Sequence, residues 1–173
     1  MNKKILFAVL PFAIVLLAIP YVGLVSAKKP MPVSFGVMLT GVDMETMEYR
    51  QNGPNWISQY ISFGVVSGDI EGSMTGEPYW IFHHWVGPIE DPYMLTVEKG
   101  NGHVLLTIDP ATVGDKTGKI VLRFNDVFGT DFAGTWVIIG GTGELKGIHG
   151  QGTWSIDFVN NIQAFEGKIH FDP

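Results

Sequence analysis

The residues best suited to acid–base chemistry are three carboxylates, Asp69, Glu71 and Glu77, in the sequence SGDIEGSMTGE (67–77). Asp69 and Glu71 are two residues apart, so on a β-strand their side chains lie on one face. Paired carboxyl groups serve proton transfer when apolar surroundings raise the pKa of one of them. Glu71 is therefore our candidate carboxylate of an internal pocket. The simpler interpretation, which we prefer, is that Asp69 and Glu71 face solvent or hydrogen-bond to the backbone at a bulge.

Two adjacent histidines, His83 and His84, occur in the sequence WIFHHW. On a strand, neighbouring side chains point to opposite faces, so these two cannot bind one metal ion together. A metal site would require His103, His149 or His170 to converge, and we predict none. Whichever histidine points inward is a candidate hydrogen-bond donor to a ligand, and we choose His84.

Large aromatic side chains combine apolar surface with polar edges, which suits the mouth of a ligand pocket. Core packing is the simpler account of any one of these rings. With Glu71 and His84, the aromatic candidates for ligand binding are Tyr60, Trp80, Phe82, Trp136 and Trp154. The sequence motif of a serine-hydrolase elbow is absent, so no catalytic residue is assigned, and no cofactor is expected.

The elements that must position these side chains are β-strands. After residue 32 the chain shows no sustained helical period, but short alternating runs bounded by Gly, Asn-Gly, Asp or Pro. Ile120, Leu122 and Phe124, for example, alternate with Lys119 and Arg123. We therefore predict an all-β fold of about eight strands. Ten strand segments are expected, two of them short or continuous with a neighbour: 33–39, 57–67, 69–75, 79–86, 93–98, 103–108, 118–125 paired with 133–139, and 150–158 paired with 162–171.

Several of these strands are apolar on both faces, notably residues 78–86 and 136–139, with 56–66 nearly so. In a closed barrel one face of such a strand fills the lumen, and the other lies under a loop, a helix or a partner subunit. Gly68 is expected to form a bulge that bends one long strand around the barrel.

The glycine-rich sequence GGTGELKGIHGQGTW (140–154) invites comparison with a phosphate-binding loop. Such loops need G-x-x-x-x-G-K-S/T or G-x-G-x-x-G between a strand and a helix, and neither the spacing nor the helix is predicted here. The triplet Gly-Thr-Trp occurs at 134–136 and again at 152–154, on both sides of the glycines. We predict a long hairpin with similar entries on its two strands.

The N-terminal segment has a basic start followed by an uncharged, mostly apolar run over residues 5–25. Small residues at 25–27 suit a signal peptidase, yet the run is long enough to span a bilayer, so a cleaved signal and an uncleaved anchor both remain open. We divide the chain into a targeting segment 1–27, a linker 28–32 and a barrel domain 33–173, and expect the domain outside the cytoplasm. Membrane contact is expected only through 5–25, if that segment stays uncleaved.

Charge and cysteine content exclude several classes of function. Without residues 1–27 the chain has 9 basic and 17 acidic residues, a net charge of −8 with histidine neutral. The basic residues are scattered, which argues against binding nucleic acid. Because the chain has no cysteine, the domain must be stabilised by its core, and thiolate chemistry is excluded.

Two motifs resemble those of a known superfamily. GGTGELKGIHGQG (140–152) resembles a motif of allene oxide cyclases and, more loosely, a segment of dirigent proteins. SGDIEGSMTGE (67–77) is similar to a segment of an uncharacterised bacterial family assigned to the same superfamily. The resemblance implies an eight-stranded antiparallel closed barrel, calycin-like, preceded by an N-terminal hydrophobic helix, with a lumen suited to an apolar ligand. Cyclase and dirigent activities do not carry over, because the catalytic residues of those families cannot be matched.

Three functions are compatible with these observations. The first is an exported barrel that binds a small apolar or amphipathic molecule in its lumen without catalysis. The second is an isomerase or cyclase-like enzyme that uses Glu71 and an inward histidine. The third is a structural surface barrel that forms homo-oligomers through its doubly apolar strands. An open lumen and a packed one are built from the same residue types, so the sequence does not choose among them.

Overall fold

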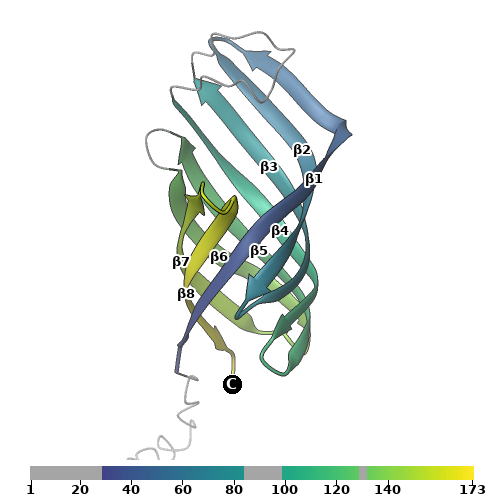
Figure 1. The fold of residues 1–173 in the computed structure, drawn as a ribbon, viewed down its shortest axis with the longest axis vertical. Helices are drawn as coiled ribbons and strands as arrows, with labels where there is room; N and C mark the ends of the chain where they lie inside the picture. Colours follow the sequence, from purple (N-terminus) through teal and green to yellow (C-terminus); the bar gives the residue numbers. More distant parts are fainter. Residues whose placement is uncertain (1–28, 84–98, 129–131) are drawn as a thin grey trace, which may run out of the picture.

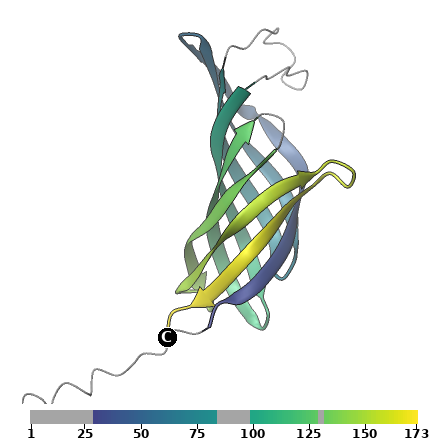
Figure 2. The ribbon, with the colours of Figure 1, turned by 90° about the vertical axis from the view of Figure 1, so that its left-hand side faces the viewer.

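The structure is a computed structural model, and it describes residues 29–83, 99–128 and 132–173. The eight strands are antiparallel and form one closed barrel in which β1 pairs with both β2 and β8 (Figures 1 and 2). The all-β prediction is confirmed. The strands are β1 (Met31–Asn52), β2 (Asn55–Gly68), β3 (Glu71–His83), β4 (Lys99–Val113), β5 (Lys116–Phe128), β6 (Ala133–Gly143), β7 (Ile148–Asp157) and β8 (Ile162–Phe171).

Within the described ranges, no helix is long and apolar enough to cross a membrane. The predicted N-terminal helix lies outside these ranges.

The hairpins 118–125 with 133–139 and 150–158 with 162–171 are confirmed as β5–β6 and β7–β8. The prediction of two separate segments, 69–75 and 79–86, is wrong, because a single strand, β3, is continuous from residue 71 to residue 83. Segment 93–98 lies outside the described residues. β1 starts inside the predicted linker, at Met31.

The prediction of a bulge at Gly68 is also wrong. β2 ends at this residue, and the chain turns there into β3. Gly68 has a φ of 120°, and a Cβ on it would lie 2.6 Å from the carbonyl oxygen of Ser34. The glycine is needed for this tight turn against β1, rather than for a bend within one strand.

β1 and β2 form a hairpin that continues well past the predicted end of the first strand at residue 39. The pairing of β1 with β2 shifts register between Leu39 and Gly41 and again between Asp43 and Glu48. Beyond the second shift most β1 side chains are exposed or half-buried. In Figure 1 the upper ends of β2 and β3 stand above those of β7 and β8.

An aromatic layer fills the middle of the lumen. It consists of Phe35, Phe124, Trp136 and Phe165, from β1, β5, β6 and β8. The ring centroids of Phe35 and Trp136 are 5.5 Å apart, and those of Phe124 and Phe165 are 5.4 Å apart. These strands are not all neighbours, so the rings meet across the interior. An eight-stranded barrel is just wide enough for side chains to fill it, and here they do.

Two inward tryptophans, Trp136 and Trp154, each lie over a glycine directly opposite on the next strand. Trp136 pairs with Gly152 and Trp154 pairs with Gly134. A Cβ on Gly152 would lie 2.7 Å from Nε1 of Trp136, and a Cβ on Gly134 would lie 2.7 Å from Nε1 of Trp154. The two Gly-Thr-Trp triplets therefore face each other, and each indole occupies the space that a side chain opposite would need.

The glycine-rich stretch between these triplets turns the chain from β6 into β7. Gly143 and Gly147 have φ values of 64° and 76°, in the left-handed region that favours glycine. Between them Leu145 is fully buried, and its N–H donates to the carbonyl of Thr142 at 3.2 Å. The predicted long hairpin is confirmed.

Substituting Gly152 with Ala is expected to destabilise the barrel by about 2–3 kcal/mol, because the new methyl group would overlap the carbonyl of Glu166 and the indole of Trp136. Urea unfolding monitored by circular dichroism measures this change. Gly140→Ala is the matched control, since a Cβ there meets nothing within 4 Å. The control should stay within about 0.5 kcal/mol of the unchanged protein. Equal effects of the two substitutions would contradict the tight tryptophan–glycine contact.

Candidate functional site

Asp126 is the one buried carboxylate among the described residues, with 3% of its surface exposed. It continues the inward phase of Ile120, Leu122 and Phe124 on β5. The sequence interpretation missed it, because the predicted strand 118–125 ends one residue before Asp126. Extending the alternation by one further step would have identified it as inward.

The register places Asp126 between two glycines, Gly102 on β4 and Gly134 on β6. Trp80 is opposite Gly102, and a Cβ on that glycine would lie 2.8 Å from Cζ3 of Trp80. Trp154 is opposite Gly134. One row across five strands therefore reads Trp, Gly, Asp, Gly, Trp, and the carboxyl lies between two indoles that cover its glycine neighbours.

The Asp126 carboxyl is buried but lacks a full set of hydrogen-bond partners, and this combination determines its pKa. Its Oδ1 atom has no hydrogen-bond partner. Burial raises the pKa of the carboxyl to about 6, and a hydrogen bond with the backbone of Val127 opposes this rise. Buried polar atoms are nearly always hydrogen-bonded, so an unpaired carboxylate oxygen calls for an explanation.

The wall that surrounds this carboxyl is partly polar. We use the term upper lumen for the interior at the level of Ser58, Trp80 and Asp126, near the end of β5. This end of the barrel, where β3 ends and β4 begins, is uppermost in Figure 1. Ser58 is 1% exposed and belongs to the same cross-strand row as Trp80. Nε1 of Trp80 donates to the hydroxyl of Tyr60 at 3.3 Å. The upper lumen thus combines aromatic rings with hydroxyl groups and one carboxyl.

The aromatic residues predicted for the ligand site fall into two groups. Tyr60 and Trp80 are half-buried, and Phe82 is buried on the inward phase of β3, two residues from Trp80. Trp136 and Trp154 are almost fully buried, and both donate Nε1 to backbone carbonyls, Trp154 to that of Asn125 at 2.8 Å. The polar edges of these two indoles are therefore already used.

Glu71 is exposed on the outward phase of β3, so its choice as the internal carboxylate is wrong. Asp69 is also exposed, and its Oδ2 accepts from the backbone N–H of Ser34 at 2.7 Å. The preferred interpretation of this pair as exposed or bonded to the backbone is confirmed, but the site is a turn between β2 and β3 and not the predicted bulge. His84 lies outside the described residues.

The histidines of the described part lie apart from the upper lumen. His149 and His170 stack on neighbouring strands with ring centroids 5.1 Å apart, and Nε2 of His149 is 3.0 Å from the carboxylate of Asp172. His83 hydrogen-bonds to two asparagine side chains, and His103 stacks on Tyr79. Among the residues with described positions, no three His, Asp or Glu side chains are grouped as a metal site would require.

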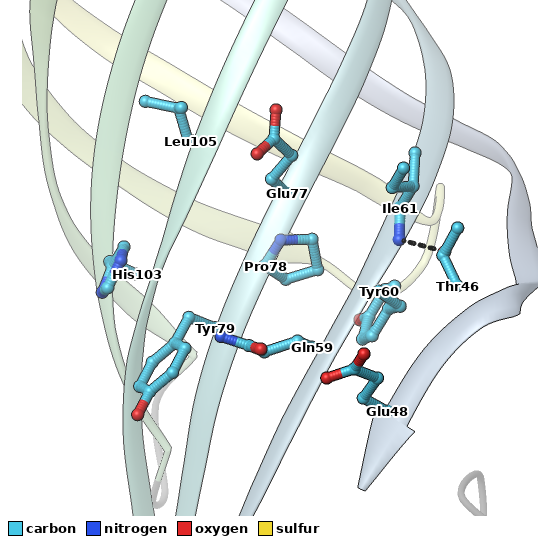
Figure 3. Close-up of a pocket in the computed structure, with 10 residues that line it drawn as sticks. All are labelled: Thr46, Glu48, Gln59, Tyr60, Ile61, Glu77, Pro78, Tyr79, His103 and Leu105. Carbon is cyan, nitrogen blue, oxygen red and sulfur yellow. Dashed lines mark hydrogen bonds between the residues drawn. The ribbon is translucent and has the colours of Figure 1, made fainter.

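A hollow of about 410 Å³ lies on the outer face of β1 to β4 (Figure 3). Glu48, Gln59, Tyr79 and His103 follow one another across these strands in register. Tyr60 also lines the hollow and, through its hydroxyl, contacts Trp80 of the upper lumen. The full lining is Thr46, Glu48, Gln59, Tyr60, Ile61, Glu77, Pro78, Tyr79, His103 and Leu105.

The hollow forms where β1 leaves its regular pairing with β2 at residues 44–47. There the hydroxyl of Thr46 accepts from the backbone N–H of Ile61 at 3.0 Å and donates to the carbonyl of Asp43 at 2.9 Å. The contact with Ile61 is drawn in Figure 3. The side chain thus replaces a backbone partner that the irregular strand has withdrawn.

We expect Asp126→Asn to change the pH dependence of stability. Because the pKa of about 6 in the folded protein exceeds the value of 3.8 for an unperturbed aspartate, the folded state binds the proton more tightly. The contribution of Asp126 to stability is therefore full below pH 4 and is lost as the pH rises to about 6. Between pH 4 and pH 7, the free energy of unfolding of Asp126→Asn should therefore rise by up to about 3 kcal/mol relative to that of the unchanged protein. Urea unfolding at each pH measures the difference, and a constant difference would contradict the raised pKa.

Replacing Thr46 with Val should release the amide of Ile61. The valine keeps the shape but removes the hydroxyl that accepts from this N–H. Hydrogen exchange at the Ile61 amide should accelerate by about 3- to 10-fold, as expected for loss of one hydrogen bond. Thr46→Ser, which retains the hydroxyl, should exchange as slowly as the unchanged protein. Equal exchange in both variants would show that the hydroxyl does not hold this amide.

Comparison with known proteins indicates fold but not function. No protein-family model matches the chain, and no curated protein matches it either. Among solved structures, it is similar to a crystal structure of a protein of unknown function from the DUF3224 family of Shewanella oneidensis MR-1. The identity is 17%, the TM-score is 0.59, and the match covers 84% of this chain and 99% of the other. At this identity, the similarity shows only that the two chains share a fold.

Proposed function

We propose that this protein is an exported barrel that binds a small amphipathic molecule in the upper lumen. The observation that carries the proposal is the unpaired Oδ1 of Asp126, on a carboxyl that is 3% exposed. A ligand that donates a hydrogen bond would satisfy this oxygen, which water reaches poorly. Trp80, only half-buried, offers aromatic surface to the apolar part of the same ligand.

The packed aromatic layer sets the depth of the proposed site. Below the upper lumen, rings from β1, β5, β6 and β8 are in mutual contact, so a ligand has no room without repacking them. At the level of Asp126, the two flanking inward positions are glycines, and Ser58 is the inward side chain on β2. Some eight-stranded barrels hold one small ligand, and here it would lie beside Asp126 and Ser58, against the indoles that cover the two glycines.

Export is supported by the sequence of the N-terminal segment. Lys3 and Lys4 precede the apolar run of residues 5–25, which is typical of a signal or an anchor. We propose that the barrel domain lies outside the cytoplasm, either released or tethered by this segment.

We also propose that the chain belongs to the allene oxide cyclase-like barrel superfamily. Each of the two motifs that resemble this superfamily spans a turn and part of its flanking strands: 67–77 runs from the end of β2 into β3, and 140–152 runs from the end of β6 into β7. The shared fold with the DUF3224 protein supports a common barrel architecture. Fold likeness alone assigns no chemistry, so the function rests on the upper lumen.

An isomerase or cyclase-like enzyme is the second candidate. The specific observation in its favour is again Asp126, whose raised pKa of about 6 suits proton transfer near neutral pH. Asp126 takes the place that we expected Glu71 to fill. Catalysis would follow ligand binding in the same upper lumen, so binding is tested first.

A structural, oligomerising barrel is the third candidate, and one surface favours it. Apolar side chains are exposed on the outer face of β1 and β2, at positions that pair across the two strands or lie beside such a pair. They are Met38, Phe63 and Val65. Analytical ultracentrifugation that finds only a monomer would remove this candidate.

The proposed function predicts that the protein carries a bound molecule or takes one up. Native mass spectrometry of the full chain, recovered from the membrane or medium of the expressing cell and incubated with a lipid extract, should show an adduct that organic solvent releases. Ser58→Leu places a larger apolar side chain in the upper lumen and should abolish the adduct. Ser67→Leu, on the exposed end of the same strand, is the control and should keep it. A bare mass for the unchanged protein after this incubation would overturn the proposal.

A further inference from the structure

The charge of Asp126 has no fixed counter-ion within the described structure. Every Lys and Arg side chain for which the structure gives a burial is exposed or half-buried, and none belongs to the core. On β5 itself, the neighbouring cation Arg123 is exposed on the outward phase. The segment that joins β3 to β4, residues 84–98, contains no Lys or Arg in its sequence. Among the side chains that the structure describes, none therefore supplies a buried cation to this carboxylate.

The groups around the carboxyl suit a cation. Trp80 and Trp154 lie one position beyond the two glycines that flank Asp126, so an indole is present on each side. The negative faces of indole rings attract cations, more strongly when water is excluded. The hydroxyl of Tyr60 accepts from the indole N–H of Trp80 and so fixes the position of this partly exposed ring.

We propose that the ligand of the upper lumen is a small molecule with a protonated amine on an apolar body, the amine donating to Oδ1 of Asp126 between the indoles of Trp80 and Trp154. This inference rests on the proposed function, and it specifies the chemical class of the ligand. The amine supplies both the missing hydrogen bond and the missing positive charge.

Other ligand classes satisfy only part of this site. A neutral alcohol donates a hydrogen bond to Oδ1 but leaves a buried negative charge without compensation, which is costly. A carboxylic acid adds a second negative charge beside the first when it ionises. An amine avoids both costs, and its apolar body can lie against the half-buried indole of Trp80.

Three probes of equal length separate these classes: octylamine, octan-1-ol and octanoic acid. Their binding to the full chain can be followed by isothermal titration calorimetry, well below the concentrations at which the probes aggregate. Octylamine should bind most tightly, and octanoic acid should not bind. Asp126→Asn keeps the shape and a hydrogen-bond acceptor but removes the charge. It should raise the Kd for octylamine by about tenfold or more, as expected for loss of a buried ionic partner.

Two further variants test whether octylamine binds only through attraction to the acidic surface of the protein. Glu166→Gln removes an exposed carboxylate on the outer face of β8 and should leave octylamine binding unchanged. Glu77→Gln removes a carboxylate of the outer hollow and should also have no effect. If Glu77→Gln abolishes octylamine binding while Asp126→Asn does not, the amine binds in the outer hollow and the inference is overturned.

The remaining outcomes distinguish this inference from the proposed function. If octan-1-ol binds as tightly as octylamine, and Asp126→Asn affects neither, the amine class is wrong but lumen binding survives. If none of the probes binds and no lipid adduct forms in native mass spectrometry, both the inference and the proposed function fail.

Discussion

The fold depends on how much side-chain volume the interior of an eight-stranded barrel can hold. Such an interior has little spare width, so a large inward ring requires a small neighbour on the facing strand. Trp136 and Trp154 meet this constraint by lying over Gly152 and Gly134, and Trp80 meets it over Gly102. The abundance of glycine, 22 residues in the chain, is partly a consequence of these contacts. They set the register of β6 with β7 and of β3 with β4.

The same constraint isolates Asp126. Its cross-strand neighbours, Gly102 and Gly134, have no side chains that could donate a hydrogen bond to its carboxyl. The indole N–H groups on both sides are used elsewhere, that of Trp80 on Tyr60 and that of Trp154 on the carbonyl of Asn125. Burial therefore raises the pKa of the carboxyl, and one of its oxygens stays unpaired. Packing and electrostatics together make this position suitable for a donor brought by a ligand.

Much of the second half of the fold could be predicted from sequence, because clear alternation and glycine turns bound β5 to β8. The first half was harder. The distal part of β1 has few buried side chains on either face, so its sequence carries no period, and Gly76 with Pro78 suggested a break inside β3. At Gly68, a turn and a bulge require the same backbone freedom. The predicted site included Trp80 and Tyr60 but chose Glu71 as its carboxylate, since the predicted strand 118–125 ended one residue before Asp126.

The central claim is that Asp126 is an uncompensated carboxylate inside the barrel. The most direct measurement is a carbon-13 NMR titration of its side-chain carboxyl in the free protein and with octylamine bound. The account predicts a midpoint at about 6 in the free protein and a lower midpoint with the amine, because a nearby positive charge favours the ionised form. A midpoint close to 3.8, the value of an unperturbed aspartate, and unchanged by the amine, would contradict it.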